Sequence, residues 1–323
     1  MILRNSFALA TAGPLALASA ALVTLPAARA TAQAAQTGME EVQDEGTAYR
    51  AWHQASQQGD NTKAMEAAKA YLAKYPTGQY ARFLTGWLGT AKMAAFDAAL
   101  REKRAADALT AGRELLKEDP DNLNVIYPLA FAAPAPDSVE FARKAIALLE
   151  AGKTMANVPN FDKNNRLAWL TQVLGLDAQK SGKPEEAIKL FQQSLALAPQ
   201  DAPVAGKNLY AIYGLRYASY SEAAKAWNAI PEADRTAAEP KPEVKAAVDR
   251  VKQESETLID SAATFVAFAK AKNLPAAARD KVNQTLEMIY KGRHPEDATL
   301  AGLQKLLQEK ETALAAAPAA PGN

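Results

Sequence analysis

The stretch Ala168–Asp201, AWLTQVLGLDAQKSGKPEEAIKLFQQSLALAPQD, decides the fold that we expect for this chain. A Leu-Gly pair occupies positions 7 and 8 of this 34-residue window, and small, bulky, small and helix-ending residues follow at positions 20, 24, 27 and 32. The residues concerned are Leu174, Gly175, Ala187, Phe191, Ser194 and Pro199. These offsets are typical of a helix–turn–helix unit that stacks against copies of itself. The turn between its two helices falls at Ser181–Pro184.

The spacing resembles that of the tetratricopeptide repeat (TPR), and the resemblance implies an interaction scaffold, since such units seldom perform chemistry. A shorter likeness covers residues 71–81, YLAKYPTGQYA. This segment is similar to repeat junctions of Gram-negative envelope proteins, among them outer-membrane assembly lipoproteins and the cell-division coordinator of the Tol system. The chain contains no Cys, so a lipidated N-terminal Cys, disulfides and zinc–thiolate sites are all excluded.

Weaker copies of the pattern predict four further helix pairs. They lie at Glu45–Gln57 with Thr62–Lys74, from Tyr80 with Arg104–Lys117, at Asn122–Ala132 with Asp137–Ala151, and at Lys207–Tyr217 with a helix around Ala223–Ile230. In the second pair, Gly112 stands where the pattern expects a bulky residue. We therefore expect an all-α fold, a right-handed α-solenoid of about five imperfect TPR-like hairpins with C-terminal capping helices.

The composition and the hydropathy pattern divide the chain into six predicted segments. They are a signal peptide (1–30), a flexible leader (31–43), the TPR-like repeat domain (44–231), a Pro-rich linker (232–242), a C-terminal helical section (243–315) and a disordered tail (316–323). The terminal helices of a solenoid need a polar outer face, which makes capping the default role of the C-terminal section.

The N-terminus has the three parts of an export signal. Arg4 supplies a positive charge, residues 7–25 are uncharged, and Ala28-Arg29-Ala30 forms a small-x-small cleavage site. We expect cleavage after Ala30 and a periplasmic or secreted protein without stable membrane insertion. The alternative is a retained membrane anchor, because the apolar stretch is nearly long enough to span a bilayer.

Nothing in the sequence selects a catalytic or metal site. The two His residues, His53 and His294, lie at opposite ends of the chain, and neither has a His partner three or four residues away. No G-x-S-x-G elbow and no Gly-rich phosphate loop occur. We therefore expect a protein that is not an enzyme and that binds no metal and no cofactor. The formal net charge of +1 gives no support for nucleic-acid binding.

Four Tyr residues, at 210, 213, 217 and 220, follow helical spacing and would lie on one helix face beside Asn208 and Arg216. They could form a peptide-binding wall, with Arg216 available for a carboxylate, or they could pack against neighbouring repeats. The candidate groove residues are Trp169, Gln172, Gln179, Lys180, Asn208, Tyr210, Tyr213, Arg216 and Tyr217. Gln172 and Leu176 occupy the positions where chaperone-cofactor TPRs use Lys and Asn, so their carboxylate clamp is not implied here. Trp87 and Trp227 adjoin consensus core positions and are expected to pack internally.

The function favoured by these patterns is binding of a protein or peptide on the concave face of the array. A second hypothesis is a structural spacer or oligomerisation module of an envelope complex. A third is an enzyme or small-ligand binder that uses the C-terminal section. The third would require a deep pocket with converging carboxylates near His294.

Overall fold

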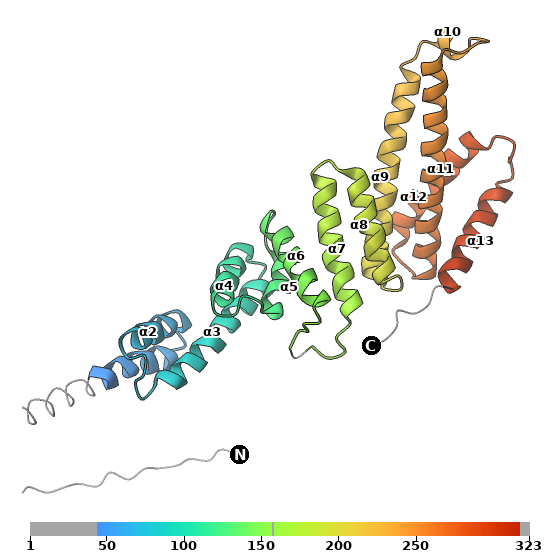
Figure 1. Ribbon diagram of the computed structural model, residues 1–323. Coiled ribbons are helices and arrows are strands. Elements are labelled where there is room, and N and C mark those ends of the chain that lie inside the picture. Colours follow the sequence, from blue (N-terminus) through green and yellow to red (C-terminus); the bar gives the residue numbers. More distant parts are fainter. Residues whose placement is uncertain (1–43, 157, 317–323) are drawn as a thin grey trace, which may run out of the picture. The chain divides into compact units, whose positions relative to one another are not determined.

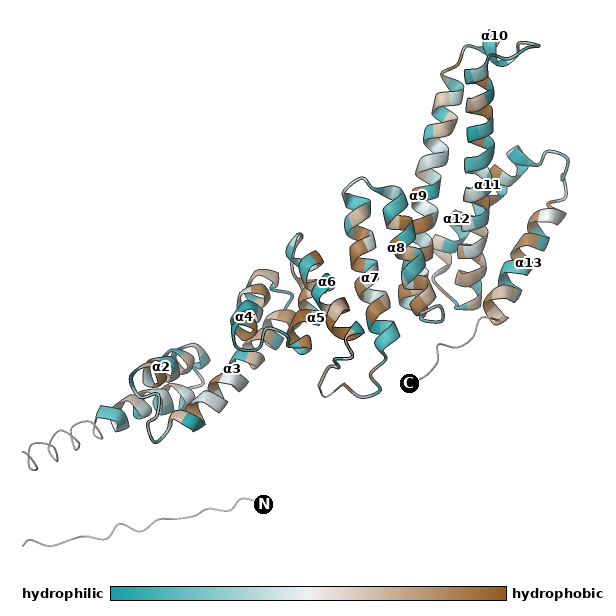
Figure 2. Cartoon of the chain, viewed as in Figure 1, coloured by the Kyte–Doolittle hydropathy of each residue, from teal (hydrophilic) through white to brown (hydrophobic). Residues whose placement is uncertain are grey.

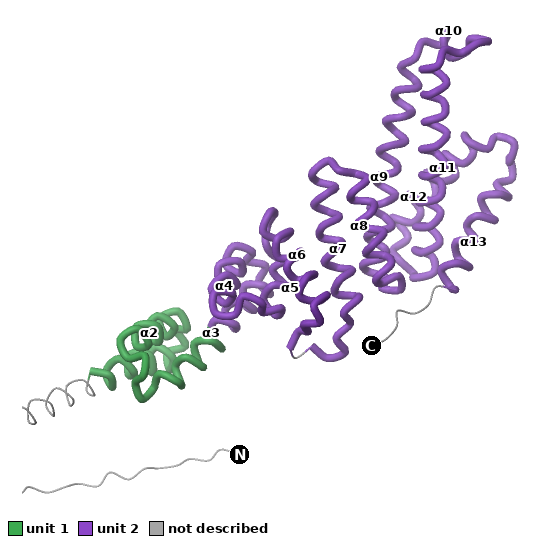
Figure 3. The backbone as a smooth tube through the Cα atoms, viewed as in Figure 1, with its two compact units in different colours: residues 1–91 green, residues 92–323 purple. Residues whose placement is uncertain are grey.

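The computed structural model describes residues 44–156 and 158–316, and these residues form helices and turns without a strand. Two compact units divide the chain, Met1–Ala91 and Lys92–Asn323 (Figure 3). The predicted signal peptide (1–30), the predicted leader (31–43) and residues 317–323 of the predicted tail lie outside the described residues. No helix in the described ranges is both long enough and apolar enough to cross a bilayer.

The first unit is built from a helix over residues 44–57, α2 (Asn61–Lys74) and the first half of α3 (Ala81–Arg101). The predicted first helix pair is thus present. Asp60 ends the turn and starts α2, because its Oδ1 accepts a hydrogen bond from the Lys63 N–H at 3.0 Å. The core of the unit comes from all three helices. It contains Trp52, Ala64, Ala68, Tyr71, Leu84 and Leu88.

The phenol of Tyr71 joins the three helices of this unit. Its hydroxyl donates to Glu45 Oε1 and accepts from the Tyr80 N–H at 3.1 Å. Glu45 Oε1 also accepts from the Gln79 N–H at 2.7 Å. Burial, followed by the contact with the Glu45 carboxylate, raises the pKa of Tyr71 from 10.0 to about 12. The entry of the chain into α3 is therefore held by a protonated phenol.

We expect Tyr71 to make the stability of the protein pH-dependent in the alkaline range. Between pH 10 and about 12 the phenol ionises in the unfolded chain before it ionises in the folded one, so the contribution present below pH 10 is lost as the pH rises. Urea denaturation across this range should show a steeper decline for the wild type than for Tyr71→Phe. Parallel curves for the two proteins would contradict this assignment.

The second unit continues with helices that each contact the next one along the chain, from α4 to α9 (Figure 1). Their bounds are α4 Ala105–Glu118, α5 Leu123–Ala132, α6 Asp137–Glu150, α7 Lys163–Lys180, α8 Pro184–Leu197 and α9 Ala202–Asn228. Apolar residues dominate α5 and line α7 and α8, whereas the tip around α10 (Glu232–Arg235) is polar (Figure 2). Consecutive neighbours of this kind are the packing scheme of a solenoid.

The α7–α8 hairpin shows why the sequence pattern specifies its packing. Phe191 is fully buried, and a Cβ atom on Gly175 would lie 2.6 Å from its ring. Position 8 must therefore lack a side chain so that position 24 can hold a large one. Ala187 is also fully buried, and the Ser194 hydroxyl donates to the Ala168 carbonyl at 2.6 Å. The consensus residues together form the interface between the two helices, and this packing is TPR-like.

The departure at Gly112 has a similar physical cause. A Cβ at this position would lie 2.7 Å from Leu129 Cδ1 and 3.1 Å from the Phe96 ring. The space that a bulky residue of α4 would fill is taken instead by Leu129 of α5 and Phe96 of α3.

The fifth predicted hairpin differs from the sequence expectation. Its two helices are one continuous helix of 27 residues, α9, without the turn expected between Tyr217 and Ala223. Residues 218–222, ASYSE, contain neither Gly nor Pro, so nothing there interrupts the helix. The helix that lies along α9 is α11 (Pro242–Ala271), and α10 and its flanking turns join the two at one end (Figure 1).

The C-terminal helices share one core with α9. α12 (Ala276–Arg293) and α13 (Ala301–Ala316) both pack on α11. The main buried contributors are Leu209 and Tyr213 of α9, Leu258, Phe265 and Phe268 of α11, Leu286 and Ile289 of α12, and Leu303 of α13. The C-terminal section is therefore helical, as expected, and its first helix, α11, packs along the last helix of the array, α9.

Candidate protein-binding surfaces

The first unit presents a cluster of aromatic side chains, which we call the aromatic face: Tyr49, Trp52, Phe83 and Trp87. The Trp52 ring lies at the centre, with centroid distances of 5.3 Å to each of the other three rings. Phe83 and Trp87 both meet it edge to face, at 79° and 78°, which is a favoured geometry for aromatic pairs. Trp52 is 5% exposed, whereas Phe83 is 53% exposed. A rigid, buried ring thus supports an exposed one.

A shallow cleft of about 620 Å³ runs along α3 beside the aromatic face. Phe83 and Trp87 line it together with the polar side chains of Gln79, Arg82 and Thr90. Its floor is open at Gly86, where an added Cβ would meet no atom within 4 Å. The Trp52 indole N–H is buried and has no hydrogen-bond partner in the described structure. The surface therefore combines apolar anchors with exposed polar side chains, as protein-binding surfaces do.

Sequence reasoning missed this surface because it assigned Trp87 to internal packing. The structure places Trp87 half-buried at the edge of the cleft. A usable signal was present in α3, where Phe83, Gly86 and Trp87 share one helix face by their spacing of three and four residues.

Two of the predicted groove residues are buried, which corrects their assignment. The Gln172 Nε2 donates to Asn208 Oδ1 at 2.7 Å, and the Asn208 Nδ2 donates to the Ser194 hydroxyl at 2.7 Å. Gln172 is 5% exposed and Asn208 is fully buried. Their amides satisfy each other between α7, α8 and α9, so neither can contact a partner of the folded protein.

The predicted Tyr wall is covered in part by the C-terminal helices. Tyr213 is buried among α9, α11 and α12, and this burial raises the pKa of its phenol. The Tyr210 ring lies 5.3 Å from that of Phe265 on α11. Tyr210 and Tyr217 keep 43% and 42% exposure. The stripe is thus mainly an interhelix contact with two exposed rings.

The remaining candidates lie at the surface of the second unit. Trp169 is half-buried, and the Lys207 ammonium lies 4.8 Å from its ring centroid. Gln179 and Lys180 are exposed at the C-terminal end of α7. Arg216 is engaged, because its Nη1 donates to Glu185 Oε1 of α8 at 3.0 Å. The structure does not gather these residues into one pocket.

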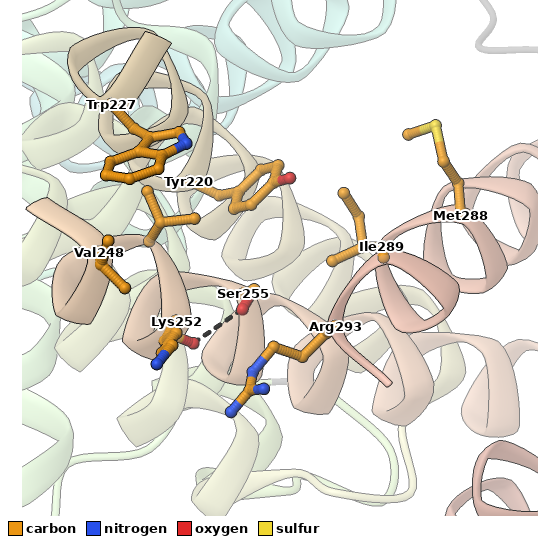
Figure 4. A pocket seen from close by; sticks show the side chains of 10 residues that line it. Tyr220, Trp227, Val248, Lys252, Ser255, Met288, Ile289 and Arg293 are labelled. Carbon is orange, nitrogen blue, oxygen red and sulfur yellow. Dashed lines mark hydrogen bonds between the residues drawn. The ribbon is translucent and has the colours of Figure 1, made fainter. Parts of the chain in front are cut away.

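Two carboxylates flank His294, but neither of them lines the adjacent pocket. His294 lies 3.7 Å from Glu256 and 3.3 Å from Glu296, at the end of α12. The adjacent pocket of about 400 Å³ is lined by apolar side chains and two cations, Lys252 and Arg293 (Figure 4). Within residues 44–156 and 158–316, no three His, Asp or Glu side chains are grouped so that they could hold a metal ion.

Comparisons with known proteins find similarity among solved structures. No protein-family model matches this sequence, and no curated protein matches it. Among solved structures, a TPR-repeat protein from Bacteroides fragilis is similar over 75% of this chain and 98% of its own, with 14% identity and a TM-score of 0.41. The TPR-like character of the fold rests on the packing of Gly175, Ala187, Phe191 and Ser194 within the α7–α8 hairpin.

Proposed function

We propose that this chain is an exported, non-catalytic scaffold that binds a protein or peptide partner. The proposed binding surface lies in the first unit, on the side formed by the first helices of its hairpins, which is concave in TPR arrays, and the aromatic face is its principal anchor. The single observation that supports this site best is the exposed Phe83 ring held against the buried Trp52 ring.

The physical reason lies in the cost of ordering a side chain on binding. Aromatic anchors that are already fixed by packing lose little freedom when a partner arrives. Phe83 and Trp87 are held by Trp52, and Arg82 stands beside them as an exposed donor. Residues of these types, Trp, Tyr and Arg above all, supply most of the binding energy at protein interfaces.

Export is supported by the charged, uncharged and small-x-small segments within residues 1–30. The proposed compartment is the periplasm or the medium, and the proposed mature N-terminus is Thr31.

We expect Phe83→Glu to weaken partner binding by at least tenfold, since loss of a central anchor typically costs about 2 kcal/mol or more. The test uses protein recovered from outside the cytoplasm, with a photo-crosslinking amino acid at position 83 in one sample and at Lys189 on α8 in another. Position 83 should give a discrete crosslinked protein that position 189 does not. Mass spectrometry of the recovered protein also identifies its N-terminal residue, which should be Thr31.

Lys69→Glu is the control, because it places the same Glu side chain on the exposed side of α2 and makes an even larger change in charge than Phe83→Glu does. It should leave the crosslinked product unchanged. Identical products from positions 83 and 189 would contradict the proposed surface, and so would equal losses of affinity for the captured protein with Phe83→Glu and Lys69→Glu.

A further inference from the structure

The long helices α9 and α11 continue past the end of α12. The last residue of α12, Arg293, lies beside Glu256 of α11, with 2.8 Å between Nε and Oε1. Residues 242–251 of α11 therefore extend beyond α12 by about 15 Å, at 1.5 Å per residue. α13 does not cover this extension, because its ion pairs with α11 join Lys310 to Asp260 and Glu311 to Lys270. The extension is a two-helix ledge that begins where α12 stops.

The ledge starts at the pocket of about 400 Å³ shown in Figure 4. Its apolar walls come from three helices: Tyr220 and Trp227 of α9, Val248 and Val251 of α11, and Met288 and Ile289 of α12. Met288 is 60% exposed, and Tyr220, Trp227, Val248 and Val251 are half-buried. The apolar seam between α9 and α11, which α12 covers lower down, is thus open to solvent here.

The charged side chains that line this pocket are positive, and one of them already pairs with a carboxylate of α11. Lys252 and Arg293 are the charged residues that line it. Lys252 is exposed and forms no ion pair within the described residues. A third cation, Arg235, stacks on the Trp227 ring at 5.6 Å. Glu256 is the carboxylate nearest to Arg293, and it also faces His294.

From this geometry we infer that the ledge binds an amphipathic helix of a partner protein whose polar face is acidic. The partner helix continues the path of α12 along the α9–α11 seam. Its apolar side chains enter the pocket beside Trp227 and Met288, and its carboxylates face Lys252 and Arg293. This site is separate from the aromatic face of the proposed function.

A helix fits the ledge better than a small molecule does. Lower down, α12 already packs on α11 and shares a core with Tyr213 of α9. The apolar lining runs from Met288 of α12 to Trp227 of α9 and is open to solvent, so it does not enclose a small ligand. Helix-in-groove recognition uses apolar anchors three and four residues apart, and the open length of about 15 Å accommodates two to three helical turns.

The test uses synthetic helices as probes, because charge and amphipathicity can be varied separately in them. The first is a stapled, dye-labelled peptide of about three to four turns with Leu on one face and Glu on the other. The second replaces every Glu by Lys, and the third has the composition of the first in an order that destroys the apolar face. Fluorescence anisotropy with the full chain should show the acidic helix binding at least tenfold more tightly than either of the others.

Variants then locate the site. Lys252→Glu and Met288→Glu should each weaken binding of the acidic helix by about tenfold or more, and both positions are exposed, so the fold should be retained. Lys189→Glu, an equal charge change on α8, should have no effect. Equal binding of the acidic and basic helices, or insensitivity to Lys252→Glu and Met288→Glu, would overturn the inference.

Two further outcomes separate this site from the alternatives. Loss of acidic-helix binding in Phe83→Glu but not in Lys252→Glu would assign the helix to the aromatic face and overturn the ledge, while the proposed function stands. Binding of dodecanoate that depends on Lys252, without binding of any helix, would overturn the helical partner in favour of an anionic amphiphile. Conversely, if the acidic helix binds the ledge but position 83 yields no crosslinked partner, the inference about the ledge stands and the proposed function of the aromatic face does not.

Discussion

Phe191→Ala should lower the free energy of unfolding of the α7–α8 region by about 3–5 kcal/mol. The ring is fully buried, and it fills the space that Gly175 leaves open by having no side chain. Removing it leaves a cavity that α7 and α8 cannot close, because their approach is already set by Gly175 and Ala187. Native-state hydrogen exchange of the amides in α7 and α8 measures this loss directly.

Leu176→Ala is the control for Phe191→Ala. Leu176 lies on the same hairpin but is 42% exposed, so its truncation should change the exchange free energies by about 0.5 kcal/mol or less. Equal effects of the two substitutions would mean that the Gly175–Phe191 contact does not hold the hairpin together.

Asn208→Leu should cost about 2–6 kcal/mol, because it removes a partner from two buried polar groups at about 1–3 kcal/mol each. Gln172 Nε2 loses its 2.7 Å acceptor and retains the Val204 carbonyl at 3.4 Å, which is a poor substitute. The Ser194 hydroxyl loses the Asn208 donor. Urea denaturation followed by the helical circular-dichroism signal gives the change in stability.

The double variant Gln172→Leu/Asn208→Leu tests the cause. When both amides are replaced by apolar groups of similar shape, no amide is left unpaired, so much of the lost stability should return. Additive losses in the double variant would show that the cost of Asn208→Leu comes from its fit in the core and not from hydrogen bonding.

The sequence predicted the hairpins well where small and large residues must alternate across an interface. Gly175 and Phe191 are informative because a side chain at position 175 would overlap the Phe191 ring. The packing of the hairpin therefore requires a small residue at one position and a large one at the other, and this requirement is visible in the sequence. The helix pairs of the first four hairpins appear in the structure close to the predicted residues. Helix boundaries marked by Pro or Gly were also predicted correctly, as at Pro184, where α8 begins.

The continuous α9 and the buried amides were not predictable in the same way. The Ala-Trp-Ile pattern at 223, 227 and 230 fits a second repeat helix as well as the end of a long one, and tertiary contact with α11 decides between them. Asn208 and Gln172 are polar residues, and the sequence pattern therefore predicts that they lie at the surface. Their burial depends on each being the other's partner across two helices, which spacing along one helix does not reveal.

The spacing of aromatic residues along a helix also did not predict which of them are exposed. Phe83 and Trp52 are both aromatic residues within helices, yet Phe83 is exposed and Trp52 is buried. The difference arises because Trp52 lies between Tyr49, Phe83 and Trp87. A candidate interface made of such rings becomes visible once the helices are packed.

Because α9 is continuous, the C-terminal helices are held to the array by packing and do not depend on the loop that connects α9 to α11. One helix contributes Ile212 and Leu215 to the core around Phe191, and Leu209 and Tyr213 to the core around Phe268. No residue between 231 and 241 is buried, so the crossing to α11 contributes little to either core. A chain divided within that crossing would consist of two fragments that recognise each other through the α9–α11 contact, and the protein could therefore exist as a complemented pair.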